Sequence, residues 1–262
     1  MVKINSIQSP KDNPLFDLQR TIYSSKNYTR RSLHQSRFRW VVDAIGKYTS
    51  GLCLSRAIEY GPGSGIYLPI LAKHSTEVIG ADIEFAYLSG IQASVRSIGN
   101  LELVVDNIQD SRFKDEIFDI ALCSEVIEHV TNPELALKTL YRILKPGGVA
   151  IITTPQRYSL MELCCKVAFL PGIIQAVRVI YREPILETGH ISLLSYGKLI
   201  AIIEDCGFKI VEHQKIGFYM PIVAEFGGDM GGRVLEVLGK CLRNSPLNWM
   251  LWTQAYVLRK PL

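Results

Sequence analysis

The sequence predicts an α/β fold with a doubly wound, mostly parallel sheet. Short runs rich in β-branched residues alternate with segments of helical spacing. A glycine-rich turn directly follows the first of these runs, and acidic residues stand just beyond the next two. Strands that alternate with helices form βαβ units, in which the strands lie parallel and helices cover both faces of the sheet.

The individual elements follow from the same alternation. Buried strands are expected at residues 57–60, 77–81, 101–105, 118–123, 148–154, 208–212 and 254–258. Helices are expected at residues 84–98, 133–144 and 196–206. Asn132 and Pro133 supply an N-cap and a first helical residue, while Gly207 ends the last helix. Residues 158–188 and 217–250 exceed a minimal core and are expected to be lid insertions, where specificity is usually built.

Composition excludes several protein classes. The chain has 262 residues, of which 48% are hydrophobic and 21% charged. Such a chain buries a substantial core, which excludes a disordered chain or a disulfide-stapled miniprotein. Lys166, Pro171 and Arg178 interrupt the longest apolar stretch, so no membrane span is expected. The N-terminus lacks a secretory signal and the six cysteines lack a disulfide or zinc spacing, which predicts a reducing cytoplasm.

The positive charge gathers at the N-terminus. Residues 1–40 hold eight Lys or Arg and two Asp, whereas the whole chain has a net charge of +4. We therefore expect a basic helical arm at residues 1–50, followed by one catalytic domain at 51–262. An anionic partner would suit the arm, whether a nucleic acid, a phosphate-bearing substrate or a lipid surface. A solvated basic face is favoured over a nucleic-acid site, because no known nucleic-acid-binding module accompanies the charges.

The glycine turn indicates a nucleotide-type cofactor. Gly61, Gly63 and Gly65 follow the first strand and precede a helix. Glycine has no Cβ, so the backbone N–H groups of such a turn can approach a ligand closely. The third glycine of a dinucleotide fingerprint would fall at Ile66, whose branched side chain argues against NAD.

Two carboxylates follow the next strands. Asp82 ends the second strand, where a carboxylate can accept hydrogen bonds from two ribose hydroxyls or cap the helix that follows. Asp106 ends the third strand, where it can accept from the amine of an adenine or cap a turn.

Taken together, these motifs resemble class I S-adenosylmethionine-dependent methyltransferases. The resemblance runs from Glu59 and the glycine turn through Asp82 and Asp106 to residues 118–130 and 144–148, with a looser continuation over 186–215. It implies a Rossmann-like, seven-stranded fold, with Pro62 as a departure within the turn. It also implies S-adenosylmethionine as cofactor, held by a set of residues that surrounds the ends of the strands: Glu59, Gly61, Gly63, Gly65, Asp82, Ile83, Asp106, Asn107 and Ser124.

A second group of residues could act on the substrate that accepts the methyl group. Glu125, Glu128 and His129 share one face if their turn is helical, and His190 is a fourth candidate ligand. This set resembles that of the ubiquinone-biosynthetic O-methyltransferases and of the small-RNA 3′-terminal 2′-O-methyltransferases, which hold a divalent ion. Mg²⁺ or Mn²⁺ is the expected ion. Without a metal, His129 or His190 is the candidate general base.

The insertion at 158–188 carries an apolar pattern. Leu160, Leu163 and Val167 predict an amphipathic helix at 159–170, and a second apolar patch follows at 173–180. The first helix is expected to pack on the core, whereas the second patch suits a lid or a membrane interface.

The combined prediction is O-methylation of a small or lipid-like hydroxylated acceptor, with peripheral membrane association. The alternatives are 2′-O-methylation of RNA, which the basic arm suggests, and a non-catalytic cofactor-binding adaptor in a membrane or assembly.

Overall fold

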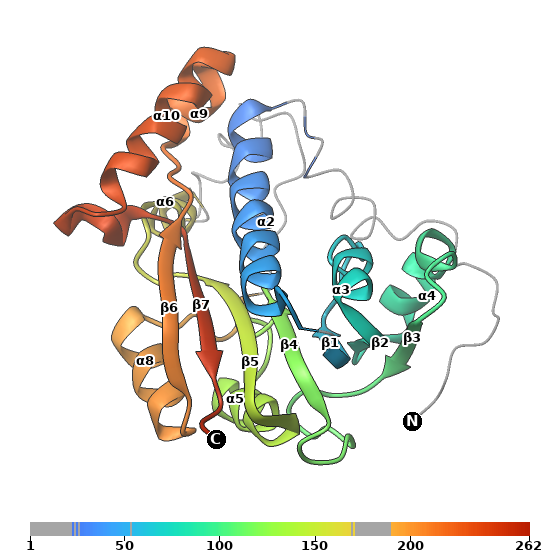
Figure 1. Cartoon of the computed structure of the whole chain (residues 1–262). Coiled ribbons are helices and arrows are strands. Elements are labelled where there is room, and N and C mark those ends of the chain that lie inside the picture. Colours follow the sequence, from blue (N-terminus) through green and yellow to red (C-terminus); the bar gives the residue numbers. More distant parts are fainter. Residues whose placement is uncertain (1–22, 24, 26, 53, 169, 171–189) are drawn as a thin grey trace.

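A single seven-stranded sheet organises the protein (Figure 1). The computed structural model describes residues 23, 25, 27–52, 54–168, 170 and 190–262. The strands are β1 (Leu54–Tyr60), β2 (Ser75–Asp82), β3 (Leu101–Val105), β4 (Phe118–Ser124), β5 (Leu144–Pro155), β6 (Lys209–Ile216) and β7 (Thr253–Arg259).

The strand order is β3-β2-β1-β4-β5-β7-β6. β1 to β5 pair in parallel, and β7 runs antiparallel to both of its neighbours. The predicted mostly parallel α/β sheet is therefore confirmed. The central strands are buried over most of their length, as expected where helices cover both faces.

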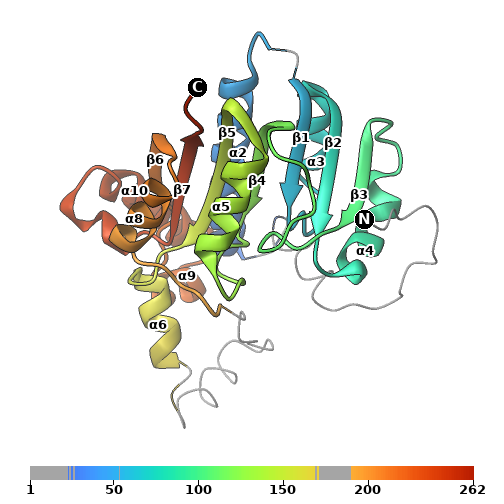
Figure 2. The same cartoon turned by 90° about the horizontal axis from the view of Figure 1, so that it is seen from below.

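Helices cover both faces of the sheet (Figure 2). On one face lie α2 (Tyr28–Thr49), α3 (Leu68–His74) and α4 (Phe85–Val95). On the other face lie α5 (Pro133–Ile143) and α8 (Tyr196–Asp205). The predicted start of α5 is confirmed, because the side chain of Asn132 accepts hydrogen bonds from the backbone N–H groups of Glu134 and Leu135.

The described part of the basic arm is a helix that enters the core. α2 buries Trp40, Val41, Ala44 and Ile45 in the same cluster as residues of β1, β2 and β4. Its exposed face carries Lys47, which pairs with Glu212 of β6 at 2.6 Å. Only part of the helix surface is therefore a solvated basic face.

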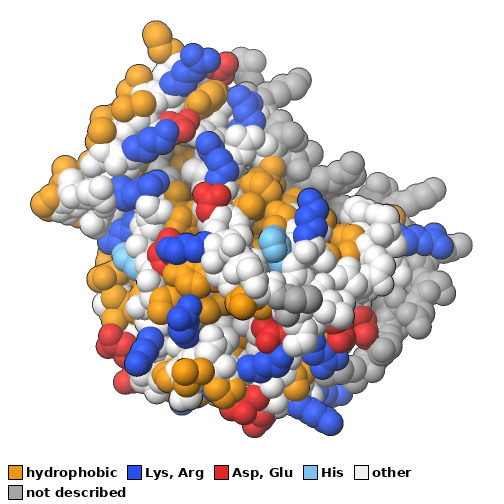
Figure 3. Space-filling view, in the orientation of Figure 1, with side chains coloured by type: hydrophobic (Ala, Val, Ile, Leu, Met, Phe, Trp, Pro, Cys, Tyr) orange, Lys and Arg blue, Asp and Glu red, His pale blue; other side chains and the backbone are white. Residues whose placement is uncertain are grey.

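The insertion after β6 forms a layer of short helices beyond the edge of the sheet. It contains α9 (Pro221–Phe226), α10 (Gly228–Leu242) and the 3-10 helix η2 (Pro246–Met250), and α10 packs against α2. A small core of Phe218, Ala224, Leu235 and Leu251 holds this layer together. Its outer face keeps many apolar side chains in solvent, visible along the upper left edge in Figure 3.

The insertion after β5 begins with α6 (Leu160–Ala168). The expectation that this helix packs its apolar stripe on the core holds only at its start: Leu160 packs against the small core around Phe218, whereas Leu163 and Val167 are exposed. Glu162 is the buried residue of the helix. The second predicted apolar patch, at 173–180, lies outside the described residues. In the part of the chain that the structure describes, no helix combines the length and the apolar character needed to cross a membrane.

Candidate functional site

The carboxyl ends of the parallel strands bring the predicted cofactor residues to one edge of the sheet. β1 ends at Tyr60, which lies beside Ala81 of β2 and Cys123 of β4. β2 ends at Asp82, opposite Val105 at the end of β3. Because these strands run in the same direction, the loops that follow them share this edge, which is where ligands bind in open α/β sheets.

The glycine turn adopts a backbone that requires glycine. Gly61, Gly63 and Gly65 all have positive φ angles, of 63°, 53° and 74°. The backbone N–H of Gly61 donates to the carbonyl of Ala81 at 2.8 Å, which fixes the turn against β2. A Cβ on Gly61 would overlap the side chain of Val126, so a larger residue would push the turn and the next loop apart.

Glu59 is a buried carboxylate inside this edge. Its side chain is only 2% exposed, and no described residue donates a hydrogen bond to its Oε2 atom. Burial raises the pKa of Glu59 well above its ordinary value. A buried carboxylate oxygen without a donor is costly, which makes Glu59 a candidate to bind a donor group of a ligand.

Asp82 and Ile83 stand at the end of β2. Asp82 Oδ1 accepts a hydrogen bond from the backbone N–H of Glu84 at 2.8 Å, so the carboxylate caps the turn that leads into α4. Burial raises the pKa of Asp82 to about 6. Ile83 is exposed beside it and offers an apolar surface at the same edge.

The remaining predicted cofactor residues each have a partner within the protein. Asp106 accepts from the Tyr60 hydroxyl at 2.9 Å and from the backbone N–H of Arg112 at 3.1 Å. Asn107 accepts from the backbone N–H of Gln109, and Ser124 shares a hydrogen bond with Thr153. The turn-capping alternative for Asp106 is therefore present in the structure, alongside any role toward a ligand.

The loop after β4 departs from the predicted helical geometry. Residues 125–131 form turns and bends, and Glu125 has a positive φ of 57°. The expectation that Glu125, Glu128 and His129 share one helical face is therefore wrong. Glu125 instead pairs with Arg37 of α2, with 2.6 Å between Oε2 and Nη1. It also accepts a hydrogen bond from Thr153 at 3.0 Å.

Arg37 joins the N-terminal helix to this edge. It is buried, its Nη2 lies 3.2 Å from His34 Nδ1, and its guanidinium lies 5.9 Å from the ring of Trp252. Burial alone would lower the pKa of Arg37, but Glu125 together with Tyr23 and Tyr67 raises this pKa above its ordinary value. The sequence contains a signal for this role, because Arg37 falls on the apolar stripe of α2, between Leu33 and Val41.

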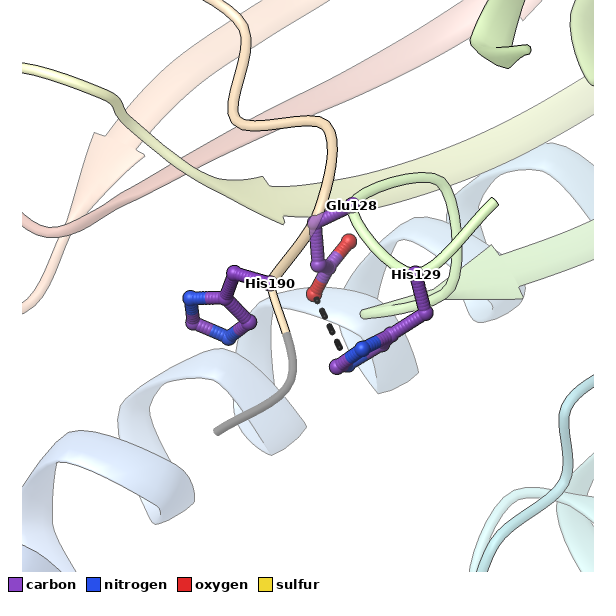
Figure 4. Close-up of side chains that lie close together, drawn as sticks. All are labelled: Glu128, His129 and His190. Carbon is purple, nitrogen blue, oxygen red and sulfur yellow. Dashed lines mark ion pairs between the residues drawn. The ribbon is translucent and has the colours of Figure 1, made fainter. Parts of the chain in front are cut away.

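Glu128, His129 and His190 do come together (Figure 4). One ligand-type atom from each lies within 4.8 Å of the others. Glu128 is fully buried, its Oε2 accepts from the Thr154 hydroxyl at 2.9 Å, and its Oε1 lies 4.0 Å from His129 Nε2. Burial, reinforced by the charge of Glu125, raises the pKa of Glu128. Three of the four predicted metal ligands thus form one cluster, without Glu125.

Backbone hydrogen bonds hold His190 against this cluster. The carbonyl of Glu128 accepts from the N–H groups of Ile191 and Ser192, at 2.9 and 3.0 Å. His190 Nδ1 lies 3.6 Å from Oε1 of Glu162, and the same carboxylate accepts from the indole N–H of Trp252 at 3.2 Å. Glu162 was not among the predicted site residues, because the pattern of its helix pointed to the apolar side chains.

Comparisons with known proteins identify the family of the chain. Residues 30–213 match the family model described as a methyltransferase domain. The ubiquinone biosynthesis O-methyltransferase of Rickettsia typhi is 25% identical over 191 residues, which cover 71% of this chain and 73% of that protein.

Solved structures show the same fold. An S-adenosylmethionine-dependent methyltransferase from Mesorhizobium loti has a TM-score of 0.59 at 14% identity, covering 87% of this chain and 99% of that one. The N-methyltransferase NodS from Bradyrhizobium japonicum, solved with S-adenosyl-L-homocysteine, has a TM-score of 0.56 at 14% identity, covering 95% and 100%. The family match spans more than half of the chain, and this protein belongs to the methyltransferase-domain family as an S-adenosylmethionine-dependent methyltransferase.

Proposed function

We propose that the protein transfers a methyl group from S-adenosylmethionine to a hydroxyl oxygen of a small or lipid-like acceptor. When bound, the cofactor supplies a methyl group on a sulfonium, which is an excellent leaving group. Glu59 would hold its ammonium, Asp82 its ribose hydroxyls, and Asp106 its adenine. Ile83, Asn107 and Ser124 complete the proposed binding edge. The unpartnered carboxylate of Glu59 and the close approach that the glycine turn allows support this assignment.

The observation that carries the oxygen acceptor is the cluster of Glu128, His129 and His190 at the edge where the glycine turn ends. A neutral imidazole can accept a hydroxyl proton near neutral pH. Glu128 lies 4.0 Å from His129 and is positioned to orient that ring. Alignment of the hydroxyl toward the methyl carbon supplies most of the remaining acceleration, for which orientation alone is worth about 7–11 kcal/mol.

A divalent cation is a further part of this proposal. The donor set is one buried carboxylate, whose Oε1 lacks a hydrogen-bond donor among the described residues, and two imidazoles. Glu125 is occupied by Arg37, so the site has fewer hard oxygen donors than the sequence suggested. Of the two ions expected from the sequence, Mn²⁺ suits such a mixed set better than Mg²⁺.

The two rival functions differ in what they require. RNA binding would draw on the basic arm, yet Arg37 is buried in an ion pair and Lys47 pairs with Glu212, which leaves fewer cations for phosphates. A cofactor-binding adaptor would bind S-adenosylmethionine without turnover. An assay of methyl transfer distinguishes such an adaptor from an enzyme.

Replacing His190 by Ala is expected to lower turnover by about 10²- to 10⁴-fold, the usual contribution of a general base. Affinity for S-adenosylhomocysteine should stay unchanged, because His190 lies on the acceptor side. The assay follows transfer of labelled methyl groups to a library of hydroxylated metabolites. His74→Ala, on α3, is the matched control.

Activity measured in the presence of a chelator distinguishes the two proposed roles of the cluster, cation binding and general-base catalysis. If a cation acts there, activity disappears in chelator and returns with Mn²⁺. Full turnover of metal-free enzyme would eliminate the cation and leave the general-base role. Equal turnover of the His190→Ala and His74→Ala variants would contradict both roles for His190.

The outer face of α9 and α10 supports peripheral membrane association. Ile222, Phe226 and Met230 follow one another at four-residue spacing and are 74%, 72% and 77% exposed. Val234 and Leu238 continue the same spacing along α10 and are also exposed. Exposed apolar side chains on two adjoining surface helices suit insertion at a lipid interface, where a lipid-like acceptor would be found.

Replacing both Phe226 and Met230 by Ser is expected to reduce cosedimentation with anionic phospholipid vesicles severalfold, because each buries apolar surface in the interface. Leu52→Ser removes another exposed apolar residue, from the loop between α2 and β1, and should have no effect. A full-length protein that does not sediment with vesicles at low salt would contradict the association.

The proposed location is the cytoplasm. The structure describes Cys123, Cys164, Cys165, Cys206 and Cys241 as free thiols. Free thiols among the described cysteines are typical of a reducing compartment.

A further inference from the structure

A pocket of about 360 Å³ opens directly beside His190. Its walls come from the start of α5, the end of β5, α6, and the segment that leads into α8, all of which lie together in Figure 2. The lining residues that carry polar or charged side chains are Thr131, Arg157, Lys166, His190, Ser192 and Lys198.

Three cations from three separate elements meet at this pocket. Arg157 follows β5, Lys166 lies on α6, and Lys198 lies on α8. Within the described residues, none of the three side chains is paired with a carboxylate, and the guanidinium of Arg157 lies 5.8 Å from the ring of its neighbour Tyr158. Several charges of one sign around a concave surface focus a positive potential inside it.

The described acids close to this region have other partners. Glu162 accepts from Trp252 and faces His190, and Glu134 at the start of α5 pairs with Lys138 at 2.6 Å. Lys138 balances the charge of Glu134. The three cations of the pocket outnumber the two remaining acids, Glu162 and the buried Glu128, so a net positive potential remains.

The floor of the pocket is built before any ligand arrives. The carbonyl of Glu128 holds the N–H groups of Ile191 and Ser192, and the carbonyl of Leu194 accepts from the N–H of Arg157 at 3.3 Å and from the side chain of Gln254 at 3.1 Å. These bonds tie the segment before α8 to the ends of β4, β5 and β7. The pocket and the His190 cluster consequently keep a fixed relation to each other.

From this arrangement we infer that the pocket binds an anionic group of the acceptor, a phosphate or a carboxylate. The inference rests on the proposed function and names the class of its substrate: a hydroxylated molecule that carries an anion next to, or a short distance from, the hydroxyl to be methylated. Arg157 offers a planar fork of donors to two oxygens of the anion, and the two lysines offer point charges. His190 lies where the pocket meets the proposed catalytic cluster, so an anchored anion orients the neighbouring hydroxyl.

The test titrates inorganic pyrophosphate and, separately, benzoate into the protein saturated with S-adenosylhomocysteine, at low ionic strength. One of these anions is expected to bind with a 1:1 stoichiometry, and which of them does so distinguishes a phosphate from a carboxylate. The triple variant Arg157→Gln, Lys166→Gln, Lys198→Gln should bind at least tenfold more weakly. All three side chains are exposed, so the variant should fold, which thermal unfolding checks. Lys73→Gln, an exposed lysine on α3, should bind as the wild type does.

Two outcomes overturn the inference: neither anion binds the wild type, or the triple variant binds as tightly as Lys73→Gln. Affinity for S-adenosylhomocysteine, measured in the same samples, separates this inference from the proposed function. Its loss in the wild type would refute the cofactor assignment, whereas normal cofactor affinity without anion binding refutes only the anion pocket.

Discussion

Replacing Arg37 by Met is expected to lower the free energy of unfolding by about 3–5 kcal/mol, the usual cost of removing one partner of a buried ion pair. The substitution leaves the partly buried Glu125 without its cation. It also leaves Glu125 close to Glu128, whose pKa the charge of Glu125 already raises. Chemical denaturation at neutral pH measures the effect.

Two controls identify the ion pair as the cause. Arg39→Met removes an exposed arginine from the same helix and should change stability by less than about 0.5 kcal/mol. The double variant Arg37→Met, Glu125→Gln removes both charges and should recover most of the loss, because a neutral buried pair needs no counter-charge. Equal stability of the Arg37→Met and Arg39→Met variants would contradict the buried pairing.

Replacing Glu59 by Gln should stabilise the protein without its cofactor while weakening cofactor binding. Burial without a partner raises the pKa of Glu59, so the folded state holds a proton that the unfolded state releases. Stability of the wild type should therefore fall as pH rises above the ordinary glutamate pKa of about 4.5. The fall ends at the higher pKa of the folded state. Gln cannot ionise, so the variant should lack this decline.

The same substitution removes the proposed partner of the cofactor ammonium. A hydrogen bond to a charged group is worth about 1.5–3 kcal/mol, so affinity for S-adenosylhomocysteine should fall roughly 10- to 100-fold. Unfolding curves from pH 4 to 8 and calorimetric titrations measure the two effects. Glu204→Gln, an exposed carboxylate on α8, should leave both unchanged. A variant that is less stable and binds normally would remove Glu59 from the cofactor site.

The sequence predicted the sheet well because its strands are short, apolar and regularly spaced. It missed the start of β5, which pairs from Leu144, because Lys145, Pro146 and Gly147 do not look like strand residues. These residues enter the strand because Leu144 pairs with Phe118 of β4 and the N–H of Gly147 donates to the carbonyl of Lys260, and no local pattern encodes such pairing.

The sequence predicted which residues of the candidate site follow strand ends. It did not predict the side-chain directions that depend on the backbone conformation of a loop. Glu128, His129 and His190 meet as expected. Glu125 does not join them, because the positive φ at that residue breaks the helical spacing from which its direction was inferred. The partner of Glu125 is Arg37, which lies far away in sequence. From its charge, Arg37 was assigned to the basic arm, although the position of Arg37 on the apolar stripe of α2 predicts that it is buried.

The central claim is that the edge formed by the glycine turn and Asp82 binds S-adenosylmethionine. Calorimetric titration of S-adenosylhomocysteine and of NAD into the wild type and into Asp82→Ala tests it most directly. We predict that the wild type binds S-adenosylhomocysteine and not NAD, and that Asp82→Ala weakens the affinity roughly 10- to 100-fold, because a charged acceptor of the ribose hydroxyls is lost. Binding of NAD by the wild type, or unchanged affinity of Asp82→Ala for S-adenosylhomocysteine, would contradict the account.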